Sequence, residues 1–568
     1  MAIEQYPRKS VARPHTEINV DTSGIGGSSS GSEKILMLVG SAKGGKPNEV
    51  YRVRNYPQAK SIFRSGDLLD AIELAWNPSP DVPGAGDILA MRVDDAKNSS
   101  LTKGALKFTS ELYGTESNEI QVALEDNELT DTKRLRLVFS KDRYNKVFDN
   151  LGKIFSINYT GEEEAATFTI EEDTVTKNAN KLILKAGTSG ALVTVREYEL
   201  GSGAFTDANV LISDINNLPD FEAKFFPIGD KNVPTATFEK EADVNIKNKK
   251  DAYVKALGGD IEKQLKYNGY VTVEIDRTKV ITDFALTKLE GGEDGLVPES
   301  WANKFSALAN EGGYYLVPLT AKPAVHAEAL AFVRDRSDNA DPMRIFVGGG
   351  VNESSEEVTS RAISLQNARA GLVGFSGTRS MDDGRIMKLP AYMLAAQVAG
   401  LTCGLEIGGA STFKHISLDA VDTIYEGTQL DQLNQSGVIM AEYVRNRSIT
   451  YFRIVQDVTT FNDKTDPVKN EISVGEANDF LCSELKIKMD DNFIGTKVIQ
   501  TSSPLVKNFI QSFLDEKVRA REIQGYEPEE VQVIIDGDVA TISMTVYPIR
   551  SLNKIVIGLV YRQQILTA

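Results

Sequence analysis

Side chains that carry metal or redox chemistry are scarce in this chain. Its 568 residues include two cysteines and three histidines. Cys403 and Cys482 cannot build a disulfide framework, and both stand in apolar stretches, so we expect inert buried thiols. The histidines, His15, His326 and His415, are far apart, and His326 stands in "HAEAL" rather than in H-E-x-x-H. We therefore expect no metal site.

Long hydrophobic runs and positive charge are also lacking. No run approaches the roughly 18 to 20 apolar residues of a membrane span, so membrane insertion is not expected. The N-terminal segment has no apolar stretch of the signal-peptide type, which favours a protein made and used in a cytosol, or released by another route. A net charge of −17 argues against direct binding of nucleic acid, which needs a basic stripe.

Catalytic constellations are missing as well. A Ser-His-Asp site needs a histidine base, and G-x-S-x-G does not occur; "GFSGT", Gly374 to Thr378, is the nearest match. The stretch "MDDG", Met381 to Gly384, is typical of a turn rather than a calcium site. We predict that the chain is not an enzyme and has no catalytic residues.

One glycine-rich stretch approaches a nucleotide-binding motif. In "ILMLVGSAKGGKPNEVYRV", Gly40, four further residues, Gly45 and Lys46 match the P-loop pattern G-x-x-x-x-G-K-[ST] except for its last residue. Pro47 replaces the hydroxyl residue that would bind Mg²⁺, and "NEVYRV" alternates like a strand, whereas a P-loop leads into a helix. We predict a strand, a turn and a second strand, and no cofactor. A degenerate P-loop protein stays open as an alternative.

The pattern of elements predicts a multi-domain fold that combines an α/β core with β modules. Helices and strands alternate in two separated segments, which indicates a largely parallel sheet. Between them, short alternating strands indicate all-β insertion modules. The C-terminal part is predicted to be α+β. The predicted domains are 1–32 (arm and Gly/Ser linker), 33–95 (first part of the core), 96–284 (all-β insertion), 285–440 (second part of the core) and 441–568 (C-terminal domain).

Both chain ends carry strand-like segments of alternating apolar residues. Near the N-terminus these are Ile18 and Val20, ahead of the linker "TSGIGGSSSGSE"; near the C-terminus they are Ile555, Ile557 and Leu559. A lone strand is not stable, so such segments favour pairing with a sheet elsewhere. This favours a self-assembling structural protein, whether tubular or on a surface.

Several longer motifs carry a family resemblance. They are "LVGSAKGGKPNEVYRVRNYPQAKSIFRSGDLLDAIELAW", "EGGYYLVPL", "PAYMLAAQVAGL", "FRIVQDVTTFND", "ANDFLCSELKIKMDDNFIGTK" and "VQVIIDGDVATISMTVYPIRSLNKIVIGLVY". In their order, they resemble contractile phage tail sheath proteins, most closely those of large long-tailed phages that infect Gram-positive bacteria. The resemblance covers nearly all of the chain.

The resemblance implies a mechanical function without bond chemistry. Subunits of this family form hexameric rings, stacked helically around a tail tube, and contraction drives the tube through the host envelope without ATP. The arms, here about 3–20 and 554–566, cross to neighbouring subunits. The implied partners are further copies of the chain, the tail tube protein, and baseplate and tail-terminator proteins. The implied location is the virion tail, assembled in the host cytoplasm, with the β-rich insertion on the outer surface.

The family also suggests a helix that contacts the tube. The equivalent segment here is 504–522, with Ser503 expected as its N-cap. Lys507, Lys517 and Arg521 fall within about 80° of one another at 100° per residue. Lys517, however, also falls within the apolar stripe of this helix.

Overall fold

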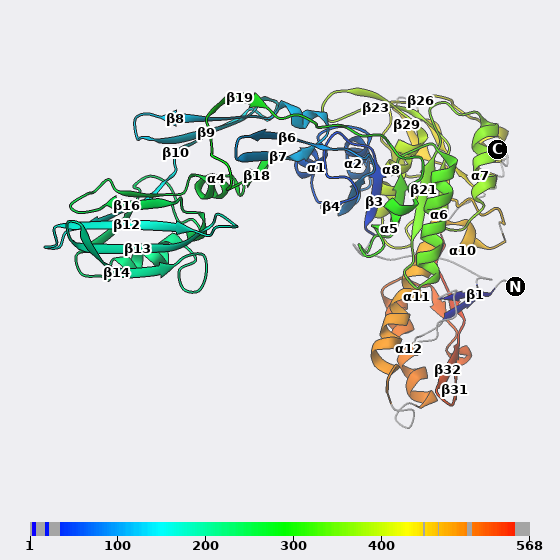
Figure 1. The fold of residues 1–568 in the computed structure, drawn as a ribbon. Coiled ribbons are helices and arrows are strands. Elements are labelled where there is room, and N and C mark those ends of the chain that lie inside the picture. Colours follow the sequence, from blue (N-terminus) through cyan, green and yellow to red (C-terminus); the bar gives the residue numbers. More distant parts are fainter. Residues whose placement is uncertain are drawn as a thin grey trace, which may run out of the picture. The chain divides into compact units, whose positions relative to one another are not determined.

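The chain forms two compact units. The computed structural model describes residues 3–6, 18–21, 34–446, 449–463, 465–496 and 502–550. One unit combines Met1–Asp94 with Val297–Ala568, and the other is Asp95–Leu296. Figure 1 shows their elements coloured along the sequence. Each unit has its own sheets and its own buried hydrophobic clusters.

The first unit is built around a seven-stranded sheet, in the order β27-β22-β21-β20-β3-β5-β4. All neighbours in it run parallel except β4 and β5. The central strands are fully buried, as a sheet covered on both faces requires. The bounds are β3 Leu36–Gly40, β4 Val50–Val53, β5 Ile88–Arg92, β20 Tyr315–Pro318, β21 Arg344–Gly348, β22 Ala370–Val373 and β27 Val438–Ile439.

Helices cover this sheet on both faces. The chain winds one way from β20 through β21 to β22 and the other way from β3 to β5, so right-handed crossovers place α6 and α2 on opposite faces. Around α6 lie α5 and α7, while α2 packs against α8 (Figure 1). The bounds are α1 Tyr56–Phe63, α2 Asp67–Trp76, α5 Ala302–Ser306, α6 Pro323–Asp338, α7 Ser355–Leu365, α8 Ala391–Gly404 and α9 Thr428–Gln435.

The contact between α2 and α8 depends on a glycine. Most residues of α8 are buried around the whole helix, as expected for a central helix. A Cβ atom on Gly400 would lie 2.3 Å from the carbonyl oxygen of Ala75. The two helix backbones can therefore approach closely only because no side chain stands at this position.

Two three-stranded sheets flank the core, and a separate C-terminal domain follows. The flanking strands are β23 Gly377–Ser380, β24 Ile386–Leu389, β25 His415–Ile416, β26 Ala420–Val421, β28 Ala441–Asn446 and β29 Ile449–Ile454. The C-terminal elements are α10 Pro467–Asn470, α11 Ile472–Phe493, α12 Ser503–Arg519, β30 Gly525–Tyr526, β31 Gln532–Asp536, β32 Val539–Ser543 and β33 Val546–Tyr547.

Helix α11 belongs to two hydrophobic clusters. At its start Ile472 packs into the cluster of the central sheet. In the second half of the helix, Leu485 and Met489 pack with α12 and the C-terminal strands in a second cluster. The division between the hydrophobic clusters therefore falls inside α11, and β28 and β29 pack with the core rather than with the domain predicted to begin at residue 441.

The second unit consists of four small antiparallel sheets and two short helices. Its ends meet where the amide of Asp95 donates to the carbonyl of Leu296 at 3.3 Å. The strands are β6 Asn98–Lys103, β7 Leu106–Tyr113, β8 Gln121–Asn127, β9 Thr132–Phe139, β10 Tyr144–Leu151, β11 Lys153–Tyr159, β12 Ala165–Glu172, β13 Ala179–Thr188, β14 Ala191–Glu199, β15 Phe221–Phe225, β16 Glu241–Asn245, β17 Tyr253–Lys255, β18 Val271–Ile275 and β19 Phe284–Lys288.

The structure corrects the sequence-based description of this unit in two respects. It is not all-β, because α3 (Ala208–Ile215) and α4 (Leu257–Leu265) lie within it. Asp207 caps α3 by accepting hydrogen bonds from the amides of Asn209 and Val210. The unit also continues past residue 284, since β19 pairs with β8.

The N-terminal segment contributes two short strands. β1 (Ile3–Tyr6) and β2 (Ile18–Asp21) pair antiparallel, with Glu4 opposite Val20 and Tyr6 opposite Ile18. In the described chain, β2 thus pairs locally rather than with another sheet. A two-stranded sheet is marginal by itself. Of the predicted arm residues, Ile18 and Val20 lie in β2, whereas Ile555, Ile557 and Leu559 lie outside the described residues.

Candidate functional site: the junction around helix α11

The P-loop-like stretch is a structural turn. The chain passes from β3 through the turn into β4, which is a strand, whereas a P-loop leads directly into a helix. The start of α2 lies beside the loop, but the amide of Leu68 donates to the carbonyl of Ser41 at 3.0 Å. Lys46 pairs with Glu49 at 2.9 Å. The glycines have packing reasons: Gly45 has a φ of +84°, and a Cβ on Gly44 would lie 2.4 Å from the carbonyl oxygen of Ile62. The predicted strand, turn and strand are confirmed, and the geometry does not support nucleotide binding.

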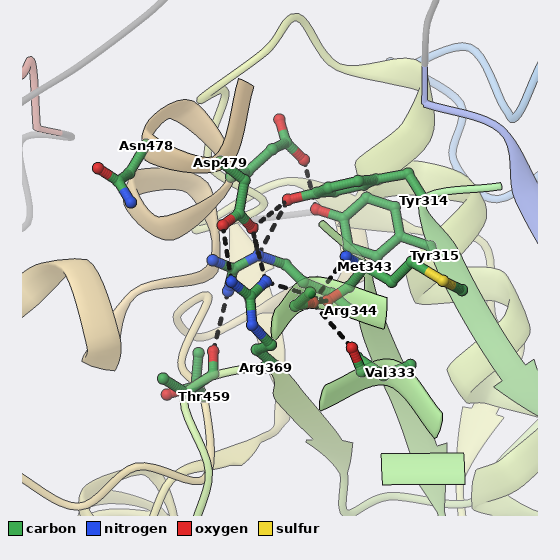
Figure 2. A network of polar contacts seen from close by, with 12 residues as sticks. Tyr314, Tyr315, Val333, Met343, Arg344, Arg369, Thr459, Asn478 and Asp479 are labelled. Carbon is green, nitrogen blue, oxygen red and sulfur yellow. Dashed lines mark hydrogen bonds and ion pairs between the residues drawn. The ribbon is translucent and has the colours of Figure 1, made fainter. Parts of the chain in front are cut away.

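The most concentrated buried charge lies where α11 meets the central sheet. Asp479 of α11 binds two arginines, Arg344 at the start of β21 and Arg369 just before β22 (Figure 2). Arg344 Nε donates to Asp479 Oδ2 at 2.9 Å, and Arg369 donates to both carboxylate oxygens at 3.1 Å. The Asp479 side chain is 3% exposed. One carboxylate therefore holds α11 against the adjacent strand β21 and the loop before β22.

The hydroxyl of Tyr314 and the charges of two arginines offset the cost of burying the Asp479 carboxylate. Tyr314 donates its hydroxyl to Asp479 Oδ2 at 2.8 Å, and burial raises the pKa of Tyr314 well above its usual value. Burial alone would raise the pKa of Asp479, but the charges of Arg344 and Arg369 outweigh it and hold that pKa below its ordinary value. Asp479 is therefore ionised at neutral pH.

A second buried pair lies one helical turn closer to the start of α11. Lys34 Nζ donates to Glu476 Oε1 at 2.8 Å, with side chains 1% and 0% exposed. Lys34 also donates to the carbonyls of Thr402 and Glu406, and Tyr315 donates its hydroxyl to Glu476. The first turns of α11 are thus joined to Lys34, two residues before β3, to β20 and to the end of α8.

These networks are structural joints. A buried ion pair stabilises a fold little compared with an apolar contact of the same shape. Loss of one partner, however, leaves the other charge buried without a counter-charge and costs several kcal/mol. Such a joint permits one arrangement of the elements it connects. The sequence analysis did not single out these residues, although charged residues in the apolar strand "MRIFV" and in the apolar half of α11 are a usable signal.

Of the three predicted tube-contact residues, Lys517 is turned inward. Lys507 is half-buried and Arg521 is exposed, but Arg521 lies beyond the end of α12. Lys517 is 6% exposed and forms ion pairs with Glu484 and Glu522. Its ammonium thus joins α12 to α11, and its prediction as a contact residue is corrected because the apolar stripe turns it inward. The N-cap is Ser502, one residue before the predicted Ser503.

His326 and His415 each contact another residue of the folded chain, and His15 lies outside the described residues. His326 is buried and hydrogen-bonds to the carbonyl of Thr320, and burial lowers the pKa of His326 to about 4. His415 lies 2.5 Å from Asp81. Among the described residues, no group of three or more His, Cys, Asp or Glu side chains could hold a metal ion. Nor do they form a helix long and apolar enough to cross a membrane.

The geometry as a whole defines a multi-domain structural protein whose buried charges hold its parts together. No family model matches the chain. It is 67% identical over its full length to a tail sheath homologue from Enterococcus phage phiEF24C, and 53% identical over its full length to the tail sheath protein of Staphylococcus phage Twort; both relatives are covered completely. The chain therefore belongs to the tail sheath proteins of phages that infect Gram-positive bacteria.

A solved structure shows the same fold. The sheath tail protein from Desulfitobacterium hafniense superposes with a TM-score of 0.54 at 15% identity, covering 92% of this chain and 94% of that one. The relatives are structural tail proteins rather than enzymes, as the sequence predicted. The chain is a structural component of the phage tail.

Proposed function

We propose that this chain polymerises as hexameric rings, stacked helically around the tail tube, and that contraction of this lattice drives the tube through the host envelope. The observation that carries the proposal is full-length identity of 67% and 53% with tail sheath proteins. The energy comes from subunit contacts that pair better in the contracted lattice, as in other bistable assemblies. Assembly in the host cytoplasm and contacts with baseplate and tail-terminator proteins belong to the same proposal.

The small sheets at the ends of the first unit supply surfaces for strand exchange. In the described part of the chain, β31 pairs with β32 alone and β1 with β2 alone, so each hairpin keeps open edges. On the β31–β32 hairpin, Ile534 and Val539 are 64% and 60% exposed. Open edges with apolar side chains invite an added strand from a neighbour. We propose the arms 3–20 and 554–566 as those strands, and the five predicted domains, with the boundaries adjusted above, as the subunit plan.

Deletion of residues 1–21 is expected to abolish tube formation, because each subunit loses the strands that join it to its neighbours. Negative-stain electron microscopy of the purified chain should show hollow striated tubes for the full-length protein and dispersed subunits for the deletion. A matched insertion of three Gly/Ser residues in the linker 22–32 should leave tubes intact. Tubes formed equally well by the deletion variant would contradict the role of the N-terminal arm.

We further propose that α12 and the residues after it face the tail tube, with Lys507 and Arg521 as contacts. Combined Lys507→Glu and Arg521→Glu is expected to leave sheath self-assembly intact and to weaken co-assembly with the tube protein by about tenfold or more, because rim charges facing an acidic partner become repulsive. Co-sedimentation with tube protein measures this. The control is Lys107→Glu with Lys266→Glu in the second unit. Equal co-sedimentation of the two double variants would remove α12 as the contact.

A further inference from the structure

The end of the C-terminal domain returns to the junction at α11. Arg550 follows β33 by three residues. Its Nη2 lies 2.7 Å from Oε1 of Glu471, the N-cap residue of α11. The side chain of Glu471 is 4% exposed and that of Arg550 is 43% exposed. This ion pair thus connects the last described residue of the chain to the end of α11 that is buried against the core.

The start of α11 concentrates negative charge. Asp457 accepts a hydrogen bond from the amide of Ser473 at 3.0 Å and another from the hydroxyl of Thr412 at 2.9 Å. Burial, together with the nearby charge of Glu471, raises the pKa of Asp457 to about 6. A helix N-terminus stabilises one carboxylate, but a buried pair needs a cation as well. Arg550 places a guanidinium there, while the neighbouring Lys469 pairs with Asp466.

Two hydrogen bonds hold Tyr547, the last residue of β33, three residues before Arg550. The amide of Gln524 donates to the carbonyl of Tyr547 at 2.6 Å, and the hydroxyl of Tyr547 donates to Glu527 at 2.7 Å. Pro548 and Ile549 are half-buried, and the ring of Pro548 restricts its φ. Only Pro548 and Ile549 therefore separate the fixed residue Tyr547 from Arg550, which binds Glu471.

We propose that Arg550 is a positioning residue, whose ion pair with Glu471 fixes at the α11 junction the point from which residues 551–568 continue toward a second copy of this chain. This inference rests on the proposed function, which assigns those residues to exchange between subunits. A segment that starts from a fixed point searches a smaller volume, so its effective concentration at a neighbour's sheet edge is higher. Without the pair, Arg550 is held only through its chain connection to β33, so its position is less narrowly defined.

The direct test measures the origin of this segment in the full-length chain. Spin labels are placed at Leu552→Cys and at the exposed helix position Ser364→Cys, with Cys403 and Cys482 replaced by Ala. Arg550→Met should at least double the width of the label–label distance distribution, and Arg550→Lys should restore most of it. The control Arg519→Met removes an exposed arginine of α12 and should leave the width unchanged. Equal widths for Arg550→Met and the parent would overturn the inference.

Assembly supplies the second readout. The critical concentration for tube formation is expected to rise about tenfold for Arg550→Met, by loss of effective concentration, and to stay unchanged for Arg519→Met. If the parent chain forms no tubes but Arg550→Met still broadens the distances, the proposed function fails and the positioning role stands. If tubes form equally well from the parent and from a folded Arg550→Met chain, the positioning role fails while the proposed function stands.

Discussion

Asp479→Asn is expected to destabilise the junction between α11 and the central sheet by about 3–5 kcal/mol, because Arg344 and Arg369 then lie buried without a counter-charge. A multi-domain chain need not unfold in one step, so hydrogen exchange resolved by peptide is the appropriate measurement. Amides in the first half of α11 should exchange about 100-fold faster or more, since each 1.4 kcal/mol is a factor of ten. β21, which begins with Arg344, and the residues around Arg369 should lose protection as well.

Two changes on the same helix separate this effect from general damage to α11. Asn478 stands next to Asp479, but its side chain is directed away from the network (Figure 2). Asn478→Ala should therefore alter protection little. Asp490→Asn removes the partner of Lys486 in the second half of the helix. These side chains are 20% and 30% exposed, far more than that of Asp479, so the change should cost about 1 kcal/mol or less. If Asp479→Asn changed protection no more than these controls, the arginine–aspartate joint would not hold the helix.

The second unit contains a comparable joint, and Asp260→Asn is expected to destabilise that unit by about 3–5 kcal/mol. Lys231 Nζ lies 2.5 Å from Asp260 Oδ2, and the side chains are 1% and 0% exposed. Asp260 also accepts a hydrogen bond from the amide of Gly152 at 3.0 Å. The change leaves a buried ammonium facing a neutral amide. Exchange should accelerate across β10, β11 and α4, while the first unit keeps its protection.

A close control lies one residue from Lys231. Asp230 also pairs with a lysine, Lys263, at 2.5 Å, but its side chain is 70% exposed. Asp230→Asn should cost about 0–1 kcal/mol, because water and salt screen the pair. The two variants remove the same charge at the same ion-pair distance, so burial alone separates them. Similar exchange rates in both would mean that the Lys231–Asp260 pair contributes no more than a surface contact.

The sequence predicted most elements of the first unit because their signals are local. Continuous apolar runs identify β3 and β21, and helical spacing identifies α2, α6 and α7. The Asp-Gly step at Asp536 and Gly537 is a local hairpin signal in the sequence. In the structure, Gly537 and Asp538 form the loop between β31 and β32, and Gly537 has a φ of +62°. In contrast, α3 was missed because a helix of eight residues inside a run of strands contributes little periodicity.

The candidate site was much less predictable. Lys517 belonged to two patterns at once, a basic cluster and an apolar stripe, and only the packing of α12 on α11 decided between them. The boundary near residue 441 was misplaced because β28 and β29 find their apolar partners in the core. The joints themselves link Arg344 with a residue 135 positions later and Lys34 with one 442 positions later.

By itself, then, the sequence determined the family, the alternation of helices and strands, and the turn at Gly40 to Lys46, since each depends on residues close together in the chain. The tertiary structure alone decided which charges are buried, that α11 is shared between two hydrophobic clusters, and that Arg550 meets Glu471. The physical reason is that a charge is costly or useful according to its burial and its partner. Both are set by elements that only the folded chain brings together.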